Sequence, residues 1–347
     1  MNNESSLVSI IIVNYNAGKL LQDCIKSLYN SNHKNLEIIV VDNNSHDNSH
    51  KECKTIFPQI KLIENKKNLG YCEGNNVGIN IATGKYIVIL NPDTTVSPSW
   101  LNELLSAESK IGPGLFQPKI MVLKDENRIS NRGNMQTIFG FGFAQDRGSL
   151  ENYNDEKIRK INYATGTCLF TSREVLDKIG IFDPFLFLYH DDLDLGWRAA
   201  HIGINSFYVP KSIIYHAESY SLKWGSKKFY WLERNRKYCL LTHYSKETYA
   251  KMRLSLFLVD LCVWLFYLSK GFLGAKIKAE LDIFRNKKAI KIRYNQLEKI
   301  KIVSDKELIK KFPDEIFVPK NVSEQIFNQL FNSILSVLSK KVKKKII

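Results

Sequence analysis

The sequence lacks three features that would define common classes of protein. No Gly-x-Gly-x-x-Gly or Gly-Lys-Ser/Thr motif follows a predicted strand, which argues against dinucleotide-binding and P-loop sites. The six cysteines form no CxxC pair, which indicates reduced thiols and a cytoplasmic setting. The first residues are polar and show no basic-then-apolar signal segment, so we expect the catalytic part to stay in the cytoplasm.

Acidic residues are scarce in the last part of the chain. The net charge is +15, and residues 251–347 contain 21 Lys/Arg against 9 Asp/Glu. This imbalance predicts an anionic partner, either phospholipid or nucleic acid. A nucleic-acid site would need aromatic residues interleaved with the basic ones, whereas here the aromatic residues flank an acidic cluster. We therefore favour an anionic membrane surface over nucleic acid, with a solvated basic tail as the alternative.

No apolar run reaches the roughly 20 residues that are needed to span a bilayer. Leu254–Leu268 has thirteen apolar residues of fifteen, with Asp260 in its middle, and we expect a buried or interfacial helix there. The apolar segment Phe331–Leu338 precedes lysines 340, 341 and 343–345. Apolar helices beside lysine clusters are typical of peripheral, monotopic binding to anionic lipid.

Strand and helix patterns alternate at the start of the chain. β-Branched residues dominate Val8–Val13 and Leu36–Val41, and apolar residues at helical spacing lie between them. A strand, a helix and a strand within about forty residues form a βαβ unit, which requires a parallel sheet. We predict an α/β domain with a mostly parallel sheet flanked by helices over residues 1–245. A helical, basic region is predicted over 246–347.

Two aspartates follow predicted strands. Asp42 ends the second strand, and Asp93 comes shortly after the strand Tyr86–Leu90. Ligands of open α/β sheets bind at the carboxyl ends of strands, where Asp42 could accept a hydrogen bond from a base or ribose. Asp93 could bind a cation that neutralises a diphosphate. The alternatives are that Asp42 caps a turn and that Asp93 bonds its own backbone.

Glycines and asparagines are concentrated in Asn68–Gly78. Three glycines at spacings of four allow close backbone approach, and Asn75 and Asn76 offer amide donors to a sugar or phosphate. The alternative is that a helix simply begins here after a glycine turn.

The chain contains four motifs in a fixed order: Val-Ser-Ile-Ile-Ile-Val-Asn-Tyr-Asn (8–16), Val-Val-Asp-Asn-Asn-Ser (40–45), Asn-Leu-Gly-Tyr-x-x-Gly-Asn-Asn-x-Gly (68–78) and Leu-Asn-Pro-Asp (90–93). Together they resemble inverting glycosyltransferase family 2, and most of all its rhamnosyltransferase-type members. The resemblance implies a GT-A fold, a nucleotide-sugar donor and contact between Asp42 and the nucleotide base. It also implies donor contacts by Asn14, Asn16, Asn43, Gly70, Asn75, Asn76 and Asn91.

The resemblance further implies a metal site that holds Mg²⁺ or Mn²⁺. Asp93 takes the place of the last carboxylate in the metal motif usually written Asp-x-Asp, while Asn91 stands in its first position. His216, at the end of a predicted strand, lies where the family has a metal- or diphosphate-binding histidine. Arg234 is a candidate clamp for the diphosphate, with an ordinary surface charge as the alternative.

An acidic cluster follows an aromatic run and resembles the family's Glu-Asp-x-Asp-Leu, with Asp191 in the glutamate place. Glycosyl transfer to an alcohol needs a carboxylate that takes the acceptor proton, and by resemblance Asp192 is that base. Asp194 is expected to organise the helix that begins here. Gly166, in a strand that borders the sugar pocket, and Trp197 complete the expected support of the active site.

These observations predict an inverting glycosyltransferase on the cytoplasmic face of the cell membrane. The best candidate reaction transfers L-rhamnose from dTDP-rhamnose to a lipid-linked oligosaccharide during surface polysaccharide assembly. A UDP-hexose donor or a protein acceptor is the alternative within the same class. A non-catalytic, basic nucleic-acid-binding protein is the alternative from another class.

Overall fold

The computed structural model describes residues 6–151, 156–217, 225–317 and 325–347. Its contacts divide the chain into two compact units, which are described separately. Unit 1 comprises Met1–Asn134, Ala144–Gly196 and Ile204–Ser221. Unit 2 comprises Met135–Phe143, Trp197–Gly203 and Leu222–Ile347.

Most of the strands and several helices belong to unit 1. Their bounds are β1 Val8–Asn14, α1 Lys19–Tyr29, β2 Leu36–Asp42, α2 Ser49–Ile56, β3 Lys61–Glu64, α3 Gly70–Ile81, β4 Tyr86–Leu90, β5 Thr94–Val96, α4 Trp100–Ile111, β6 Leu115–Val122, β7 Asp125–Asn131, β10 Arg159–Ile161, β11 Cys168–Ser172, α5 Arg173–Ile179, the 3₁₀ helix η2 Pro184–Leu186 and β12 Ser206–His216. Strands β8 Asn134–Gln136 and β9 Gly142–Ala144 and helix α6 Asp191–His201 have residues in both units. Unit 2 also holds α7 Ser226–His243, α8 Lys246–Ser269, α9 Leu273–Arg285, α10 Lys287–Ile300, α11 Asp305–Ile309 and α12 Gln325–Ile346.

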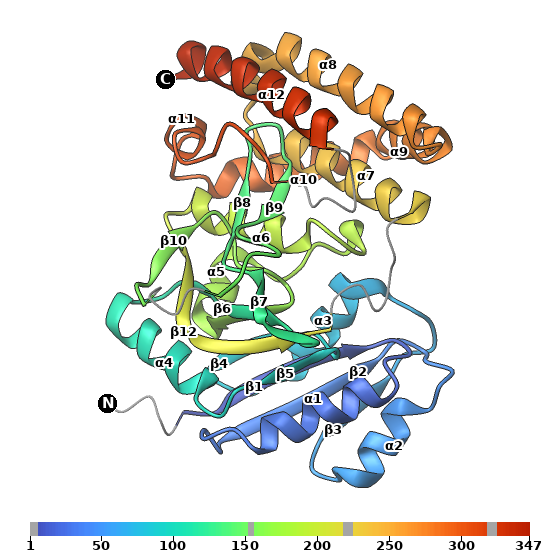
Figure 1. Cartoon of the computed structure of the whole chain (residues 1–347), viewed down its shortest axis with the longest axis vertical. Helices are drawn as coiled ribbons and strands as arrows, with labels where there is room; N and C mark the ends of the chain where they lie inside the picture. The colour runs from blue at the N-terminus through green and yellow to red at the C-terminus, as the bar shows by residue number, and fades with distance from the viewer. Residues whose placement is uncertain (1–5, 152–155, 218–224, 318–324) are drawn as a thin grey trace. The chain divides into compact units, whose positions relative to one another are not determined.

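The sheet of unit 1 has the strand order β10-β12-β6-β11-β4-β1-β2-β3, with β5 and β7 paired beside that path. Strands β3, β2, β1 and β4 are parallel, β11 runs antiparallel to β4 and β6, and β12 is parallel to β6 (Figure 1). The predicted α/β fold with a mostly parallel sheet is confirmed. The strands predicted at 8–13 and 36–41 extend by one residue each, to Asn14 and Asp42.

Side chains of β1 alternate between two buried faces of this sheet. Ile10 and Ile12 belong to a core that also contains α1 and α4 residues such as Leu21 and Trp100. Ile11 points to the other face, where a Cβ on Gly78 of α3 would lie 2.4 Å from its Cγ2 atom. Burial of both faces explains why β1 reads as an unbroken apolar run.

The described residues of the polar stretch 124–160 contain regular structure. Strand β7 pairs antiparallel with β6, and β8 pairs with β9. Glu151, whose side chain is 2% exposed, accepts hydrogen bonds from Lys119 at 2.7 Å and Arg132 at 3.1 Å. This carboxylate is therefore buried because both cations pair with it in the folded state.

Unit 2 is built mainly from helices, as predicted for the C-terminal region. Phe229 and Tyr230 of α7 pack with Val263 and Tyr267 of α8 and Ala279 of α9. Helix α7 belongs to unit 2 by its contacts, whereas the predicted boundary after residue 245 assigns it to the N-terminal domain. As a division into independently folding domains, that boundary stays a prediction. Among the described residues, α8 is long and apolar enough to cross a membrane, a test that core helices also pass.

Candidate active site

The carboxyl ends of β1 and β2 bring two predicted donor-binding residues together. Asn14 and Asp42 are register partners, and Asn14 Nδ2 donates a hydrogen bond to Asp42 Oδ1 at 2.8 Å. Asp42 Oδ2 accepts from the backbone N–H of Ser45 at 2.9 Å, and His50 Nδ1 lies 3.3 Å from Oδ1. The buried Asp42 thus organises the turn after β2. A carboxylate has about four acceptor positions, so Asp42 can accept a further hydrogen bond from a nucleotide. That contact stays a prediction.

Asn16 and Asn43 tie the neighbouring loops together. Asn16 has a positive φ of 55°, its N–H donates to Ser45 Oγ, and its Oδ1 accepts from the N–H of His46 at 2.8 Å. The buried Asn43 donates from Nδ2 to the carbonyl oxygen of Gly70 at 2.9 Å. These bonds fix the loop after β1, the loop after β2 and the start of α3 against one another.

The glycine-rich segment forms helix α3, which begins at Gly70. The alternative interpretation of this segment, a helix that begins after a glycine turn, is therefore correct for the backbone. Gly70 has a φ of +78°, and a Cβ there would lie 2.5 Å from the Phe187 ring. A Cβ on Gly74 would lie 2.9 Å from Val13 Cγ1. Glycine is needed at these positions because it lets the helix approach the sheet and the Phe187 loop.

Asn75 and Asn76 lie on buried turns of α3. Asn75 Nδ2 donates to the Tyr71 carbonyl at 2.8 Å, and Asn76 Nδ2 donates to the Phe182 carbonyl at 3.0 Å. Their Oδ1 atoms have no hydrogen-bond partner within the described ranges. The amide donors expected to face a ligand are thus engaged inside the protein, and a donor contact by either residue stays a prediction.

Asp93 and His216 converge from two paired strands. Thr94, the first residue of β5, pairs with His216, the last residue of β12. This pairing places His216 Nε2 3.3 Å from Asp93 Oδ2. Asn91 lies just beyond β4, and its backbone N–H donates to the carbonyl of Thr167 at 3.0 Å. A carboxylate and an imidazole on adjacent strands suit a divalent cation, whose remaining positions diphosphate oxygens and water can fill.

The acidic cluster starts helix α6 beside the segment that precedes β11. Asp192 Oδ2 accepts a hydrogen bond from the Gly166 N–H at 3.1 Å, and its Oδ1 accepts from the N–H of Leu193 at 2.8 Å. Asp191 is 5% exposed, whereas Asp192 is half-buried. The residue after Gly166, Thr167, accepts the N–H of Asn91 at its carbonyl. The segment 166–167 therefore connects Asp192 to the end of β4, close to Asp93.

The two neighbouring carboxylates differ in their electrostatics. Burial raises the pKa of Asp192, while the hydrogen bonds from Gly166 and Leu193 oppose that shift. Burial raises the pKa of Asp191 well above its usual range, and the charge of Asp192 raises it further. Asp191 therefore resists ionisation more strongly than Asp192, which makes Asp192 the better candidate to accept a proton.

Tyr71 is a site residue that sequence reasoning did not identify. Its hydroxyl donates to the carbonyl of Gly166, and a Cβ on Gly166 would lie 2.7 Å from that hydroxyl and 3.2 Å from Asp191 Oδ2. Burial, followed by the charge of Asp191, raises the pKa of Tyr71 well above 10, so the phenol remains a donor. The available signal was its place in Asn-Leu-Gly-Tyr, directly after Gly70.

The backbone before the acidic cluster is strained. Phe187, Tyr189 and His190 have φ values of 61°, 68° and 59°, which non-glycine residues seldom adopt. The carbonyl of Phe187 accepts the N–H of Tyr71 at 2.7 Å. Strained backbone concentrates at functional sites, where the surrounding structure enforces it. Here the strain directly precedes the residue predicted to be the base.

Three further predicted residues are placed as follows. Asp194 is fully buried in the first turn of α6, and its N–H donates to the His190 carbonyl at 2.8 Å. Trp197 and Arg234 belong to unit 2. The Trp197 ring stacks on His243 with centroids 4.5 Å apart, and the Arg234 guanidinium lies 4.6 Å from the centre of the Trp231 ring. Their predicted roles in catalysis and diphosphate binding stay predictions.

The mostly parallel sheet flanked by helices is the architecture of GT-A glycosyltransferases. Residues 9–180 match the model of glycosyl transferase family 2, and the chain belongs to that family. The predicted family, fold and enzyme class are confirmed.

Two relatives illustrate the range of that similarity. The chain is 25% identical over 242 residues to an N-acetylglucosaminyl-diphospho-decaprenol L-rhamnosyltransferase of Mycobacterium tuberculosis, covering 62% of this chain and 78% of the relative. It is 26% identical over 204 residues to the low-salt glycan biosynthesis hexosyltransferase Agl10 of Haloferax volcanii, covering 57% of this chain and 63% of that protein.

Two solved structures share the fold at lower identity. GalNAc-T7 with UDP, GalNAc and Mn²⁺ superposes with a TM-score of 0.56 at 17% identity, over 72% of this chain and half of that one. The mannosyltransferase PcManGT of Pyrobaculum calidifontis, in complex with GDP-Man and Mn²⁺, gives a TM-score of 0.50 at 15% identity. That match covers 98% of this chain and 87% of the mannosyltransferase.

Proposed function

We propose that this glycosyltransferase transfers L-rhamnose from dTDP-rhamnose, with inversion, to a lipid-linked saccharide. The observation that carries the reaction class is the half-buried Asp192 beside the buried Asp191, with the Gly166 N–H donating to Asp192 Oδ2 at 3.1 Å. The donor and acceptor rest on the similarity to the mycobacterial rhamnosyltransferase, whose name specifies a diphospho-decaprenol acceptor.

Asp192 acts as the general base in this proposal. An acceptor hydroxyl gives its proton to the Asp192 carboxylate as its oxygen forms a bond to C1 of the donor sugar. The bond between C1 and the diphosphate oxygen breaks on the opposite face, and the nucleoside diphosphate leaves with the electron pair. Tyr71 keeps the Gly166 carbonyl fixed, and the Gly166 N–H thereby holds Asp192 in position.

Asp93 and His216 would hold Mg²⁺ or Mn²⁺ in this proposal. Their side-chain atoms already lie 3.3 Å apart, so a cation between them needs little rearrangement. A bound cation neutralises the charge of the departing diphosphate. Asn91, in place of a carboxylate, leaves fewer anionic ligands, and we expect the donor diphosphate to complete the coordination. Both structural neighbours were solved with Mn²⁺.

The proposed acceptor places the enzyme at the cytoplasmic face of the membrane as a peripheral protein. The supporting observation is the basic C-terminal part of the chain together with the apolar helix α8. Positive charge beside apolar helices favours binding to anionic lipid.

A donor screen tests the proposal most directly. Release of nucleoside diphosphate would be measured with dTDP-rhamnose, UDP-glucose, UDP-N-acetylglucosamine and GDP-mannose, each with Mg²⁺ and with Mn²⁺. We expect the largest kcat/KM with dTDP-rhamnose. Preference for a UDP-hexose would support the hexosyltransferase alternative, and no turnover with any donor and a diphospholipid acceptor would refute the proposal.

A further inference from the structure

Helix α8 exposes one continuous apolar stripe. Exposed leucines recur every three or four residues, so they lie on a single helix face. They are Leu254, Leu258, Leu261, Leu265 and Leu268, with exposures of 37% to 67%, and Phe257 beside them is 64% exposed. We call these six residues the α8 stripe. Contiguous exposed apolar surface of this kind marks an interaction site in a soluble protein.

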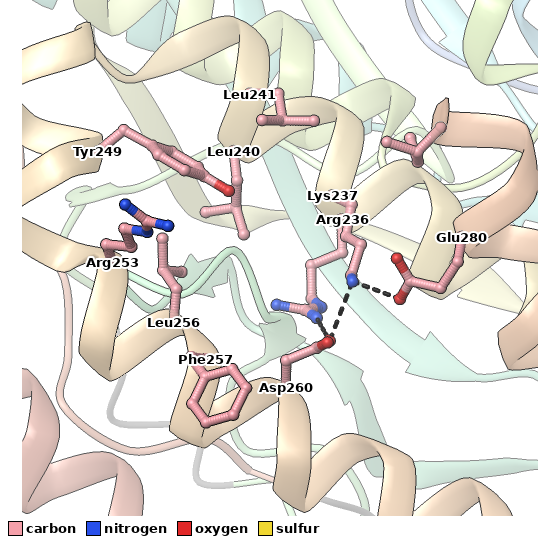
Figure 2. A pocket seen from close by; sticks show the side chains of 11 residues that line it. Arg236, Lys237, Leu240, Leu241, Tyr249, Arg253, Leu256, Phe257, Asp260 and Glu280 are labelled. Atoms are coloured by element: carbon pink, nitrogen blue, oxygen red, sulfur yellow. Dashed lines mark hydrogen bonds and ion pairs between the residues drawn. The ribbon is translucent and has the colours of Figure 1, made fainter. Parts of the chain in front are cut away.

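The flank of α8 next to Phe257 is held by ion pairs to α7 and α9. Asp260 Oδ1 lies 2.6 Å from Lys276 Nζ and 3.1 Å from Lys237 Nζ. Lys276 is fully buried and also contacts Glu233 at 2.6 Å. Figure 2 shows Asp260, Lys237 and Glu280 joined in this way at one end of a cavity of about 300 Å³. A helix that crossed a bilayer would have to break these pairs, leaving charged groups unpaired in hydrocarbon.

Unpaired cations border the stripe. Arg253 lines the cavity beside Phe257 (Figure 2), and Lys270 follows the last turn of α8. Within the described part of the chain, neither side chain pairs with a carboxylate, and both are exposed. Two copies joined along this stripe would bring like charges together. An anionic lipid surface would neutralise them, so the charge favours lipid over self-association.

We propose that the α8 stripe is the surface that docks on an anionic bilayer, with α8 lying in the plane of the interface. The leucines and Phe257 enter the boundary of the acyl chains, while Asp260 stays on the protein side in its ion pairs. This inference deepens the proposed function and rests on it for the lipid-linked acceptor. It adds the contact surface and the orientation of the helix.

Vesicle flotation tests the surface. The variant Leu258→Gln/Leu261→Gln/Leu265→Gln removes the middle of the stripe, and Ile56→Gln/Ile111→Gln removes exposed apolar side chains from unit 1 as a matched control. Vesicles of phosphatidylcholine with and without phosphatidylglycerol would be used. We expect the stripe variant to bind anionic vesicles about a hundredfold more weakly, because it loses three leucines that enter the lipid in the proposed complex. The control variant should bind as the wild type does. Equal binding by the stripe variant and the wild type would overturn the proposal.

Cysteine labelling tests the orientation. Lys246→Cys and Lys270→Cys, each in a Cys262→Ser background, mark the two ends of α8, and the other five cysteines are buried. With the protein bound to vesicles, both ends should react with a membrane-impermeant maleimide. Protection of one end only, reversed by detergent, would show a spanning helix and overturn the in-plane orientation.

Two controls separate this inference from its alternatives. Light scattering in solution that shows a dimer for the wild type and a monomer for the stripe variant would identify a second copy as the occupant and overturn the lipid assignment. Hydrolysis of the nucleotide sugar should be the same in the stripe variant and the wild type. If no donor is used although the stripe still binds vesicles, the proposed function fails while the docking surface stands.

Discussion

The pair Asp191 and Asp192 gives the sharpest test of the site. Burial and the charge of Asp192 raise the pKa of Asp191 well above its usual range, so Asp191→Asn replaces a carboxyl that resists ionisation by an amide of similar shape. We expect kcat to fall only a few-fold. Asp192→Asn removes the proton acceptor, and general-base catalysis typically contributes about a hundredfold to ten-thousandfold in rate. That loss corresponds to about 3–5 kcal/mol of transition-state stabilisation.

The assay is kcat/KM against pH, with donor affinity measured separately. In the wild type, activity should rise as pH increases through the raised pKa of Asp192, because the ionised carboxylate is the active form. This rise should persist in Asp191→Asn and vanish in Asp192→Asn, with donor affinity nearly unchanged in both. Asp177→Asn, an exposed carboxylate on α5, is the matched control and should behave as the wild type. A loss as large in Asp191→Asn as in Asp192→Asn would refute the assignment of the base.

The remaining predictions concern the metal, the glycine beside the base, the ion network and the tail. Asp93→Ala should raise KM for the donor at least tenfold and reduce sensitivity to added Mg²⁺ or Mn²⁺, as equilibrium donor titrations would show; activity that resists both EDTA and this change would contradict a metal role. Gly166→Ala should lower kcat by about a hundredfold, because a Cβ meets the Tyr71 hydroxyl at 2.7 Å and displaces the support of the base; a thermal melt would check that the variant is folded at the assay temperature. Lys276→Met should cost about 1–3 kcal/mol in urea unfolding, since Glu233 loses its lysine but keeps its hydrogen bonds from Arg236. Against the effect of burial, Arg236 and then Lys276 hold the pKa of Glu233 at about 2, below the usual 4.5, so this stability is present above about pH 4.5 and is lost as pH falls toward 2. Replacing four tail lysines by glutamine should weaken vesicle binding at low salt and have little effect at high salt; an unchanged affinity at low salt would exclude the tail as an anchor. These lysines are 340, 341, 344 and 345.

Local sequence patterns were sufficient to predict those elements whose residues are buried or exposed according to their position along the chain. The apolar runs that became β1, β2 and β4 are buried on both faces, so their pattern was continuous and their boundaries were nearly right. Strands β1 and β2 were each predicted one residue short, so Asn14 and Asp42 were placed just beyond the strand ends. Local patterns did not bring Asp93 and His216 together, because their proximity depends on the register between β5 and β12, which lie more than a hundred residues apart. Only the family resemblance assigned both residues to a metal site.

Other features depend on contacts between distant segments. Gly70 and Gly74 of α3 make room for Phe187 and Val13, which no local pattern reveals, while the predicted donor contact of Gly70 stays a prediction. The polar stretch 124–160 gives no local sign that Glu151 is buried between Lys119 and Arg132. In each case a partner from a distant segment changes the meaning of a residue.

Contacts with distant residues also decide which charges of the C-terminal lysines and of α8 are paired. Sequence alone grouped five C-terminal lysines as one free cluster, but Lys343 lies 2.7 Å from Asp314 and donates to the Phe312 carbonyl at 2.6 Å. A deletion of residues 339–347 would therefore also remove a structural ion pair, and substitution of the other four lysines is the cleaner test. Asp260 looked like an obstacle within an apolar helix, yet its ion pairs are what fix α8 to its neighbours. Charges that are paired inside unit 2 stabilise its packing, so only the unpaired ones contribute to the attraction between the protein and lipid.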